Sequence, residues 1–279
     1  MKKIISLLLA TFAFVAVVPT FVACENEDED IKQGPQITLT TNMEVGDAII
    51  LRFNRDNVPT EVIGAEKIHE ALIDLDGGYF ESWCVDITYK ITSQTIILKG
   101  NIARLRCQGN ELVGLDVSEC PGLSLLQCEY NQLTTLDVSN NPKLEYLGCN
   151  YNELTQLDVS KNSKLEWLAC ASNNLTTLDT SKNSKLEILS CANNKLTSLD
   201  ISNNKLMYNL DCSNNIIKAA EMSKIIKSLR DWKYATISYP WALITDHATL
   251  YAVSDNSIEE NEISEEDVKI AQDKNWRFE

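Results

Sequence analysis

The sequence predicts a repeat solenoid of short parallel strands, stacked at one strand per 21-residue repeat, with a β-rich cap before the repeats and an α+β cap after them. Two observations lead to this prediction. The first is a column of cysteines spaced 21 residues apart: Cys107, Cys128, Cys149, Cys170, Cys191 and Cys212. The second is that each cysteine has a leucine two residues before it, an asparagine three residues after it and a leucine or isoleucine five residues after it. A fixed period of about 20 to 50 residues is the mark of a solenoid or a related array.

Within each repeat the chain is expected to turn twice. Both halves of the unit begin with alternating apolar residues, which favours a short strand, and end in Ser, Asn or Lys, which favours a turn. One repeat cannot fold alone, because burying each apolar side chain contributes roughly 1.5 to 3 kcal/mol, whereas ordering each residue's backbone costs about 1 to 2 kcal/mol. Stacked repeats must therefore share one core of Leu and Cys columns, with the Asn column satisfying backbone groups in the turns.

The repeat unit resembles a known family. Six consecutive units over residues 102–217 follow the pattern LxxLxCxxNxLxxLDVSxNxx, and the last unit is degenerate. This pattern is similar to the leucine-rich repeat, in particular to its 21-residue bacterial subclass with two nested half-motifs. Residues 91–98 and 267–272 resemble, more loosely, the caps of bacterial leucine-rich-repeat surface lipoproteins. The resemblance implies a leucine-rich-repeat solenoid that is displayed on a bacterial surface and binds another protein.

Geometry argues against disulfides and metal ions in the cysteine column. Parallel strands lie about 4.8 Å apart and in-register side chains point the same way, so neighbouring Cβ atoms would exceed the usual separation of about 3.5 to 4.5 Å in a disulfide. A straight row of thiols also cannot converge on a tetrahedral ion. We therefore expect six reduced, buried thiols and no metal site. Cys84 and Cys120 lie off the column, and the sequence leaves their pairing open.

A second column consists of aspartates, at Asp116, Asp137, Asp158, Asp179 and Asp200. Carboxylates about 4.8 Å apart repel each other by roughly 1 kcal/mol even in water, so they must be exposed, hydrogen-bonded or screened. A calcium rail is the alternative, but no Gly-rich calcium loop accompanies the column. Local hydrogen bonds and nearby lysines are the favoured explanation. Residues 74–78 also lack a full set of calcium ligands, and we expect a turn there.

The start of the chain has the pattern of an export signal. Lys2 and Lys3 precede an apolar stretch over residues 4–18, which Pro19 closes. Residues 1–23 are therefore expected to be a signal peptide. The apolar stretch is short for a transmembrane helix, which needs about 20 apolar residues.

Residues 21–24 resemble a lipobox, although Phe21 stands in place of the usual leucine. The resemblance implies that Cys24 carries a lipid and becomes the new terminus. It also places the protein in the outer membrane, lipid-anchored at the cell surface. Secretion without a lipid is the alternative. The acidic segment 24–34 is expected to be a solvated tether, as in surface-exported lipoproteins.

Charge and motif content argue against nucleic acid binding and against catalysis. The net charge is −15, and no basic cluster offsets it, so phosphate backbones would be repelled. The sequence has only two histidines, His69 and His247, and contains no zinc-protease motif, nucleophile elbow or phosphate-binding loop. A glycosidase with two carboxylates is a remaining alternative, although a thin solenoid offers no obvious deep cleft. We expect neither an enzyme nor a cofactor.

The segment before the repeats, residues 35–100, is expected to be a β-rich N-terminal domain. Runs of strand-forming residues predict strands over residues 37–40, 48–53 and 85–89. Between them, a short helix is expected near residues 66–72.

The segment after the repeats, residues 218–279, is expected to form the α+β cap. Apolar residues at helical spacing predict a first helix: Met222, Ile225, Ile226, Leu229 and Trp232. Ser264 and Asp267 form a capping-box signature before a second helix. Strands are expected over residues 248–253 and 276–278. Such caps protect the ends of a solenoid from aggregation.

The outward positions of the repeat strands supply the candidate binding surface. Residues on either side of the second leucine in LxxLxC alternate away from the core. The candidate ligand-binding residues lie in this column or at its margin: Leu125, Tyr130, Tyr146, Tyr151, Trp167 and Ile188. Tyr and Trp suit a binding hot spot, because they bury a large area with few rotamers to freeze. The alternatives are that the caps cover these residues, or that they are ordinary surface apolar residues.

The sequence therefore predicts a non-catalytic cell-surface lipoprotein, expected to be monomeric, that binds a protein partner in adhesion or host interaction. A glycan-binding lipoprotein, with Tyr146 and Trp167 as stacking platforms, is the alternative. A purely structural spacer is the third possibility. No metal, cofactor or nucleic acid partner is expected.

Overall fold

The computed structural model describes residues 34–74, 83–231, 248–251 and 261–278. Residues 34–279 cluster as one compact unit. The predicted signal peptide, the acidic tether apart from its last residue, Cys24 and most of the turn expected over residues 74–78 lie outside the described residues.

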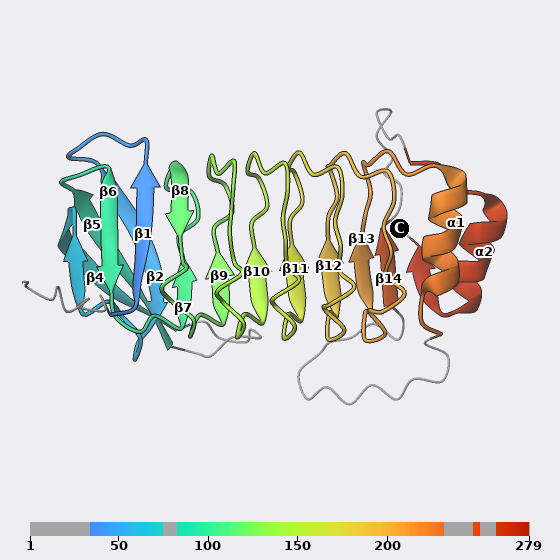
Figure 1. The fold of residues 1–279 in the computed structure, drawn as a ribbon, viewed down its shortest axis with the longest axis horizontal. Coiled ribbons are helices and arrows are strands. Elements are labelled where there is room, and N and C mark those ends of the chain that lie inside the picture. Colours follow the sequence, from blue (N-terminus) through green and yellow to red (C-terminus); the bar gives the residue numbers. More distant parts are fainter. Residues whose placement is uncertain (1–33, 75–82, 232–247, 252–260, 279) are drawn as a thin grey trace, which may run out of the picture. The chain divides into compact units, whose positions relative to one another are not determined.

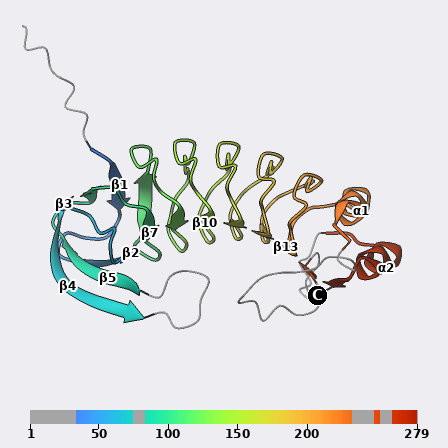
Figure 2. The same cartoon turned by 90° about the horizontal axis from the view of Figure 1, so that it is seen from below.

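The repeats form the predicted stack of parallel strands (Figure 1). Six strands of three residues lie side by side: β7 (Arg104–Arg106), β9 (Leu125–Gln127), β10 (Tyr146–Gly148), β11 (Trp167–Ala169), β12 (Ile188–Ser190) and β13 (Asn209–Asp211). Their register follows the repeat, since Tyr146 pairs with Trp167 and Leu147 pairs with Leu168. Figure 2 shows these strands along one side of the repeats and the returning loops along the other. The solenoid prediction is confirmed.

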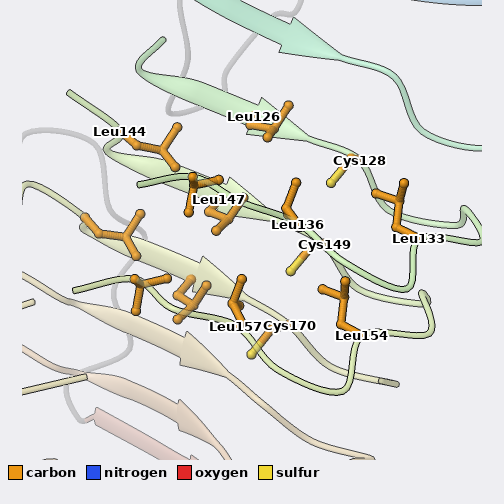
Figure 3. Packing of buried hydrophobic residues seen from close by; sticks show 14 of the residues in the cluster. Leu126, Cys128, Leu133, Leu136, Leu144, Leu147, Cys149, Leu154, Leu157 and Cys170 are labelled. Carbon is orange, nitrogen blue, oxygen red and sulfur yellow. The ribbon is translucent and has the colours of Figure 1, made fainter. Parts of the chain in front are cut away.

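The leucine and cysteine columns fill the interior (Figure 3). Leu126, Leu147, Cys128 and Cys149 are completely buried. All eight cysteines in the described part of the chain are free, which confirms the expected reduced column and also answers the open pairing of Cys84 and Cys120. Burial raises the pKa of five thiols of the column, those of Cys107, Cys128, Cys149, Cys170 and Cys191, to about 12 for Cys170, so these five are neutral at physiological pH.

The asparagine column binds the backbone of the turns, as predicted. Asn152 Nδ2 donates to the carbonyl oxygens of Cys128 and Cys149 at 3.0 and 3.1 Å, and its Oδ1 accepts from Leu133 N at 3.0 Å. Asn131, Asn173, Asn194 and Asn215 repeat this pattern. One buried amide per repeat therefore ties each turn to its neighbour.

Six strands build the N-terminal part: β1 (Gln36–Thr41), β2 (Ala48–Asn54), β3 (Glu61–Ile63), β4 (Ala65–Asp74), β5 (Trp83–Ile91) and β6 (Thr95–Lys99). Strand β8 (Leu112–Asp116) belongs to the first repeat. The three strands that the sequence predicted in the N-terminal part correspond to β1, β2 and β5. Strands β4, β5 and β2 continue the sheet of the repeats by antiparallel pairing of β2 with β7, and β3, β6, β1 and β8 form a second sheet. The N-terminal part is thus joined to the repeats at two seams, β2 with β7 and β1 with β8.

The helix expected near residues 66–72 is wrong. This segment lies in strand β4, which pairs with β5 from Ala65 to Asp74, with a register shift between Lys67 and His69. Local spacing of apolar residues suggested a helix, but hydrogen bonds to a distant strand decide the structure. Strand β4 ends its sheet, and Ile68 and Leu72 are exposed on it.

The C-terminal part contains α1 (Ala219–Ser228), β14 (Ala248–Tyr251), α2 (Glu265–Asp273) and β15 (Trp276–Phe278). Both predicted helices and both predicted strands are present, although Trp232 lies outside the described residues. Asp267 N donates to Ser264 Oγ at 3.1 Å, which confirms the predicted N-terminal capping of the second helix, α2. Lys274 Nζ donates to the carbonyl oxygens of Lys227 and Leu229 at the end of α1. Among the described residues, none of the helices has the length and apolar character needed to cross a membrane.

Candidate functional site

The predicted binding residues lie on the strand side of the repeats, but not all of them are exposed. Trp167 and Ile188 are partly exposed. Leu125 and Tyr146, expected to face solvent, are only 1% and 7% exposed. Leu125 lies in register between Arg104 and Tyr146 on the neighbouring strands, and the ring of Tyr146 packs at 4.9 Å from that of Trp167. Large neighbours in adjacent repeats therefore cover these two positions.

A small groove opens beside Tyr146 and Trp167. It has a volume of about 170 Å³ and is lined by Arg104, Glu145, Tyr146, Glu166, Trp167, Glu187, Ile188 and Tyr208. We call it the Glu–Trp groove. It brings together three of the predicted residues, Tyr146, Trp167 and Ile188. The prediction missed its carboxylates, although Glu145, Glu166 and Glu187 recur at the 21-residue period, each directly before an outward residue.

Backbone pairing holds the three glutamates in line. Glu166 N donates to the carbonyl oxygen of Glu145 at 2.9 Å, and Glu187 N donates to that of Glu166 at 2.8 Å. Adjacent parallel strands are about 4.8 Å apart, so the pairing of the strands forces the carboxylates of neighbouring glutamates close together, where they repel each other. The pKa of the Glu166 carboxyl is raised, first by desolvation and then by the charges of Glu187 and Glu145. The groove therefore concentrates negative charge against an aromatic wall.

A fourth carboxylate, that of Glu129, lies beside Tyr146. Glu129 is 7% exposed, and its Oε2 has no hydrogen-bond partner among the described residues. Its carboxyl group lies across Gly148, where a Cβ would approach Glu129 Oε1 to 2.1 Å and Tyr146 Cε1 to 3.3 Å. Burial raises the pKa of Glu129. Glycine at position 148 thus gives this carboxylate its place next to the tyrosine ring.

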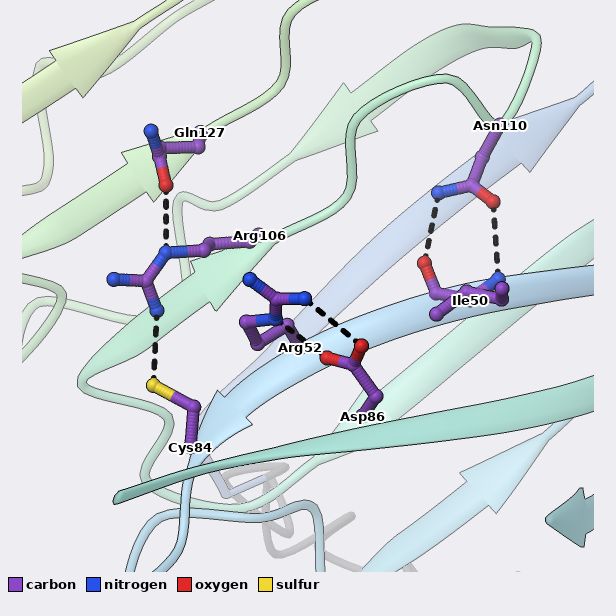
Figure 4. A network of polar contacts seen from close by, with 7 residues as sticks. All are labelled: Ile50, Arg52, Cys84, Asp86, Arg106, Asn110 and Gln127. Atoms are coloured by element: carbon purple, nitrogen blue, oxygen red, sulfur yellow. Dashed lines mark hydrogen bonds and ion pairs between the residues drawn. The ribbon is translucent and has the colours of Figure 1, made fainter. Parts of the chain in front are cut away.

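A polar network anchors the first repeats to the N-terminal strands (Figure 4). Arg106 Nε donates to Gln127 Oε1 at 2.6 Å, and Arg106 Nη1 donates to Cys84 Sγ at 3.5 Å. Arg52 pairs with Asp86 across β2 and β5. This network joins neighbouring strands, and we assign it a structural role.

The remaining predicted residues, Tyr130 and Tyr151, form an exposed stacked pair. Their ring centroids are 4.5 Å apart with an interplanar angle of 9°, and the residues are 61% and 50% exposed. Both have positive φ angles, of 56° and 53°. The equivalent residues two and three repeats after Tyr151 are Asn193 and Asn214, which tolerate this backbone region better.

The aspartate column is held by local hydrogen bonds, as predicted. Ser139 N donates to Asp137 Oδ1 at 2.8 Å, and the same bond recurs at Asp158, Asp179 and Asp200. These bonds lower the pKa of the carboxyls. Across the described ranges, no three His, Cys, Asp or Glu residues are placed to hold a metal ion. Of the two histidines, His69 is exposed on β4 and His247 lies outside the described residues.

The 21-residue turns, the parallel strands and the buried leucine, cysteine and asparagine columns define a leucine-rich-repeat solenoid, the fold class that the sequence predicted.

Among known proteins, the chain is similar to solved structures of bacterial leucine-rich-repeat proteins. No family model and no curated protein matches the chain. Among solved structures, a functional domain of InlJ from Listeria monocytogenes, described as including a cysteine ladder, is 30% identical over 66% of this chain and 46% of that chain, with a TM-score of 0.47. The internalin InlF from Listeria monocytogenes is 19% identical over 57% of this chain and 42% of that chain, with a TM-score of 0.45.

A leucine-rich-repeat protein of Leptospira interrogans is 20% identical, over 60% of this chain and 46% of that chain, with a TM-score of 0.44. The chain spans less than half the length of each of these three structures.

Proposed function

We propose that this protein is a non-catalytic surface protein that binds a protein partner through the strand side and adjacent turns of its repeats. The single observation that carries the proposal is the exposed stacked pair of Tyr130 and Tyr151. A non-glycine residue in the left-handed region costs roughly 1 to 2 kcal/mol. Two large aromatic side chains held there, in solvent, favour a role in contact with a partner over a role in folding.

The Glu–Trp groove supports the same surface. Trp167 and Ile188 are partly exposed beside the buried ring of Tyr146, so the strand side offers a second aromatic contact. It lies on the two repeats that follow the repeat of Tyr151. Strands fix the backbone at the groove, and hydrogen bonds from Tyr130 N and Tyr151 N to the next repeat fix the backbone at the tyrosine pair. Contacts held in place before binding limit the entropy lost on binding. The proposed partner surface therefore spans the tyrosine pair and the groove.

The test is a capture experiment with surface proteins of host or neighbouring cells. It compares which of these proteins are retained by the full-length chain and which by the double variant Tyr130→Ser/Tyr151→Ser. We expect a specific protein to be retained by the native chain and lost with the double variant. Val45→Ser is the control, because Val45 is 65% exposed in the N-terminal part and lies outside the proposed surface. Equal retention by all three proteins would contradict the proposal.

The glycan alternative has a separate outcome. A glycan ligand would be assigned by three results together. The native chain binds to a glycan array, Tyr146→Ala and Trp167→Ala abolish this binding, and no protein is retained in the capture experiment. If neither ligand class is bound and no substitution changes anything, a structural spacer is the correct description.

We also propose that the protein is exported and anchored in the outer membrane through a lipid on Cys24, facing outward. The support is the signal pattern of residues 1–23 and the lipobox-like residues 21–24. Cys24→Ala should move the protein from the membrane fraction to the soluble fraction, whereas Cys120→Ala should not. Membrane association of Cys24→Ala equal to that of the native chain would contradict the anchor. We expect the solubilised protein to be monomeric, which light scattering would check.

A further inference from the structure

We propose that the Glu–Trp groove receives a cationic side chain, lysine or arginine, from the protein partner. This inference rests on the proposed function and makes it more specific, because it names the chemistry that the partner must present.

The aromatic wall of the groove is the first basis. Trp167 is partly exposed, and its ring meets that of Tyr146 at 50°, with centroids 4.9 Å apart. Trp faces attract ammonium and guanidinium groups when the cation lies within about 6 Å of the ring. Ile188 adds an apolar contact for the methylene stem of such a side chain.

The charge of the groove is the second basis. Glu145 and Glu166 line it and form no ion pair within the described residues. Three carboxylates face one guanidinium, that of Arg104, so the lining is net negative. A cation placed between Glu145 and Glu166 would relieve the repulsion that neighbouring parallel strands impose on them.

Glu129 is an independent third basis. This side chain is more than nine-tenths buried, and its Oε2 is unpartnered in the described part of the chain. Because its carboxyl group lies next to the Tyr146 ring, it adds negative potential behind the aromatic wall. Gln127 and Gln108 donate hydrogen bonds to this carboxyl group, and Arg106 lies close enough to act on its charge, but Oε2 keeps an unused acceptor. A buried acceptor without a donor favours a positive group nearby.

The size of the groove limits what it takes. Its volume of about 170 Å³ is below the roughly 300 to 1,000 Å³ of pockets that enclose a whole small molecule. One extended side chain fits this volume better than a free ligand. The groove is therefore a subsite within a larger protein contact.

The experiment measures binding of four short peptides to the full-length protein by calorimetry at low salt: tetralysine, tetraarginine, tetraglutamine and tetraglutamate. We expect the two basic peptides to bind and the other two not to bind. The double variant Glu145→Gln/Glu166→Gln should bind the basic peptides about tenfold more weakly, since it removes two of the three carboxylates that line the groove. Trp167→Ala should weaken the same peptides.

The control is Glu153→Gln/Glu111→Gln, which changes the net charge by the same amount at two exposed glutamates outside the groove. It separates the groove from attraction by the acidic protein as a whole. Because Glu145 and Glu166 are exposed and repel each other, their substitution should not lower the thermal midpoint. Basic peptides that bind the groove variant and the native chain equally would overturn the inference.

Protein capture distinguishes this inference from the proposed function. If a protein is retained by the native chain, lost with Tyr130→Ser/Tyr151→Ser, but retained at full strength by Glu145→Gln/Glu166→Gln, the function stands and the cationic subsite is wrong. If the basic peptides bind through the groove but no protein is retained, the subsite stands and the proposed protein-binding function is wrong.

Discussion

At the residue scale, the repeats depend on buried amides. Each asparagine of the column, such as Asn152, supplies donors to two carbonyl oxygens and an acceptor to one backbone N–H. No apolar side chain can do this, because the turns would then bury unsatisfied backbone groups. The same logic explains a second buried column, in which Asn162 Nδ2 donates to the carbonyl oxygens of Val138 and Asn141. Cys120 occupies the first position of that second column.

The first prediction concerns one of these amides. Asn152→Ala should lower the free energy of unfolding by about 3 kcal/mol or more, because each buried backbone group left unsatisfied costs roughly 1 to 3 kcal/mol. Urea unfolding followed by circular dichroism measures the change. Asn140→Ala is the matched control, because Asn140 is exposed and lies beside the buried Asn141. Equal stabilities of the two variants would show that the amide column does not stabilise the fold.

At the element scale, the stacked turns place identical side chains in columns, and the members of a column share the same surroundings. The buried thiols of Cys128, Cys149 and Cys191 all have a pKa well above the ordinary value, with desolvation as the main cause. The thiolate is the reactive form of cysteine. Burial therefore removes access along the whole column, and it suppresses thiolate formation wherever it raises the pKa.

The second prediction follows for alkylation. Brief treatment of the native protein with iodoacetamide at neutral pH should leave the six column thiols unmodified, and the same treatment in denaturing urea should label all of them. Peptide mass spectrometry assigns each site. Free labelling of the column in the native protein would contradict the stacked arrangement itself.

The third prediction uses the exposed aspartate column. The pKa values of Asp137, Asp158, Asp179 and Asp200 are lowered, mainly by hydrogen bonds from the serine two residues later. A lowered pKa stabilises the folded state at pH values above the ordinary aspartate range. This stabilisation declines as the pH enters that range and is lost once the pH has fallen through the lowered folded-state pKa. The thermal midpoint of the native protein should therefore decrease as the pH is lowered below about 5. The decrease should be less steep in a variant with all four of these aspartates changed to Asn, which keeps the acceptor oxygen. Parallel pH profiles of the two proteins would contradict this explanation.

The same scale shows what the sequence could predict. The repeat strands, their register and their buried columns follow from one period, because each position has the same neighbours in every turn. Strand β4 could not be predicted, since the spacing of Ile68, Ala71 and Leu72 is helical and its pairing with β5 is not local. In the site, the tyrosine pair and Trp167 were predicted as candidates, and their binding role stays a prediction. The glutamates of the groove had a periodic signal, whereas the burial of Leu125 and Tyr146 depends on the neighbouring side chains of the assembled strands.

At the scale of the compact unit formed by residues 34–279, both sheets cross from the N-terminal part into the repeats. Strand β2 pairs with β7, and β1 pairs with β8, so the first repeat has a partner on each of its two sheets. Asn110, the first asparagine of the column, joins the same seam, because its side chain bonds both the N–H and the carbonyl oxygen of Ile50 at 3.1 Å. The N-terminal strands thus complete the solenoid as a cap.

The last prediction removes this cap. Deleting residues 1–100 would uncover the backbone edges of β7 and β8 and expose Leu105 and Leu112, both fully buried in the intact chain. Open edges beside apolar surface recruit further chains, so the truncated protein should elute as aggregates in size-exclusion chromatography. Deleting residues 1–33 is the control, and this protein should elute as the full chain does, because the compact unit begins at residue 34. A soluble repeat domain that starts at residue 101 and melts at the native temperature would show that the repeats do not need the cap.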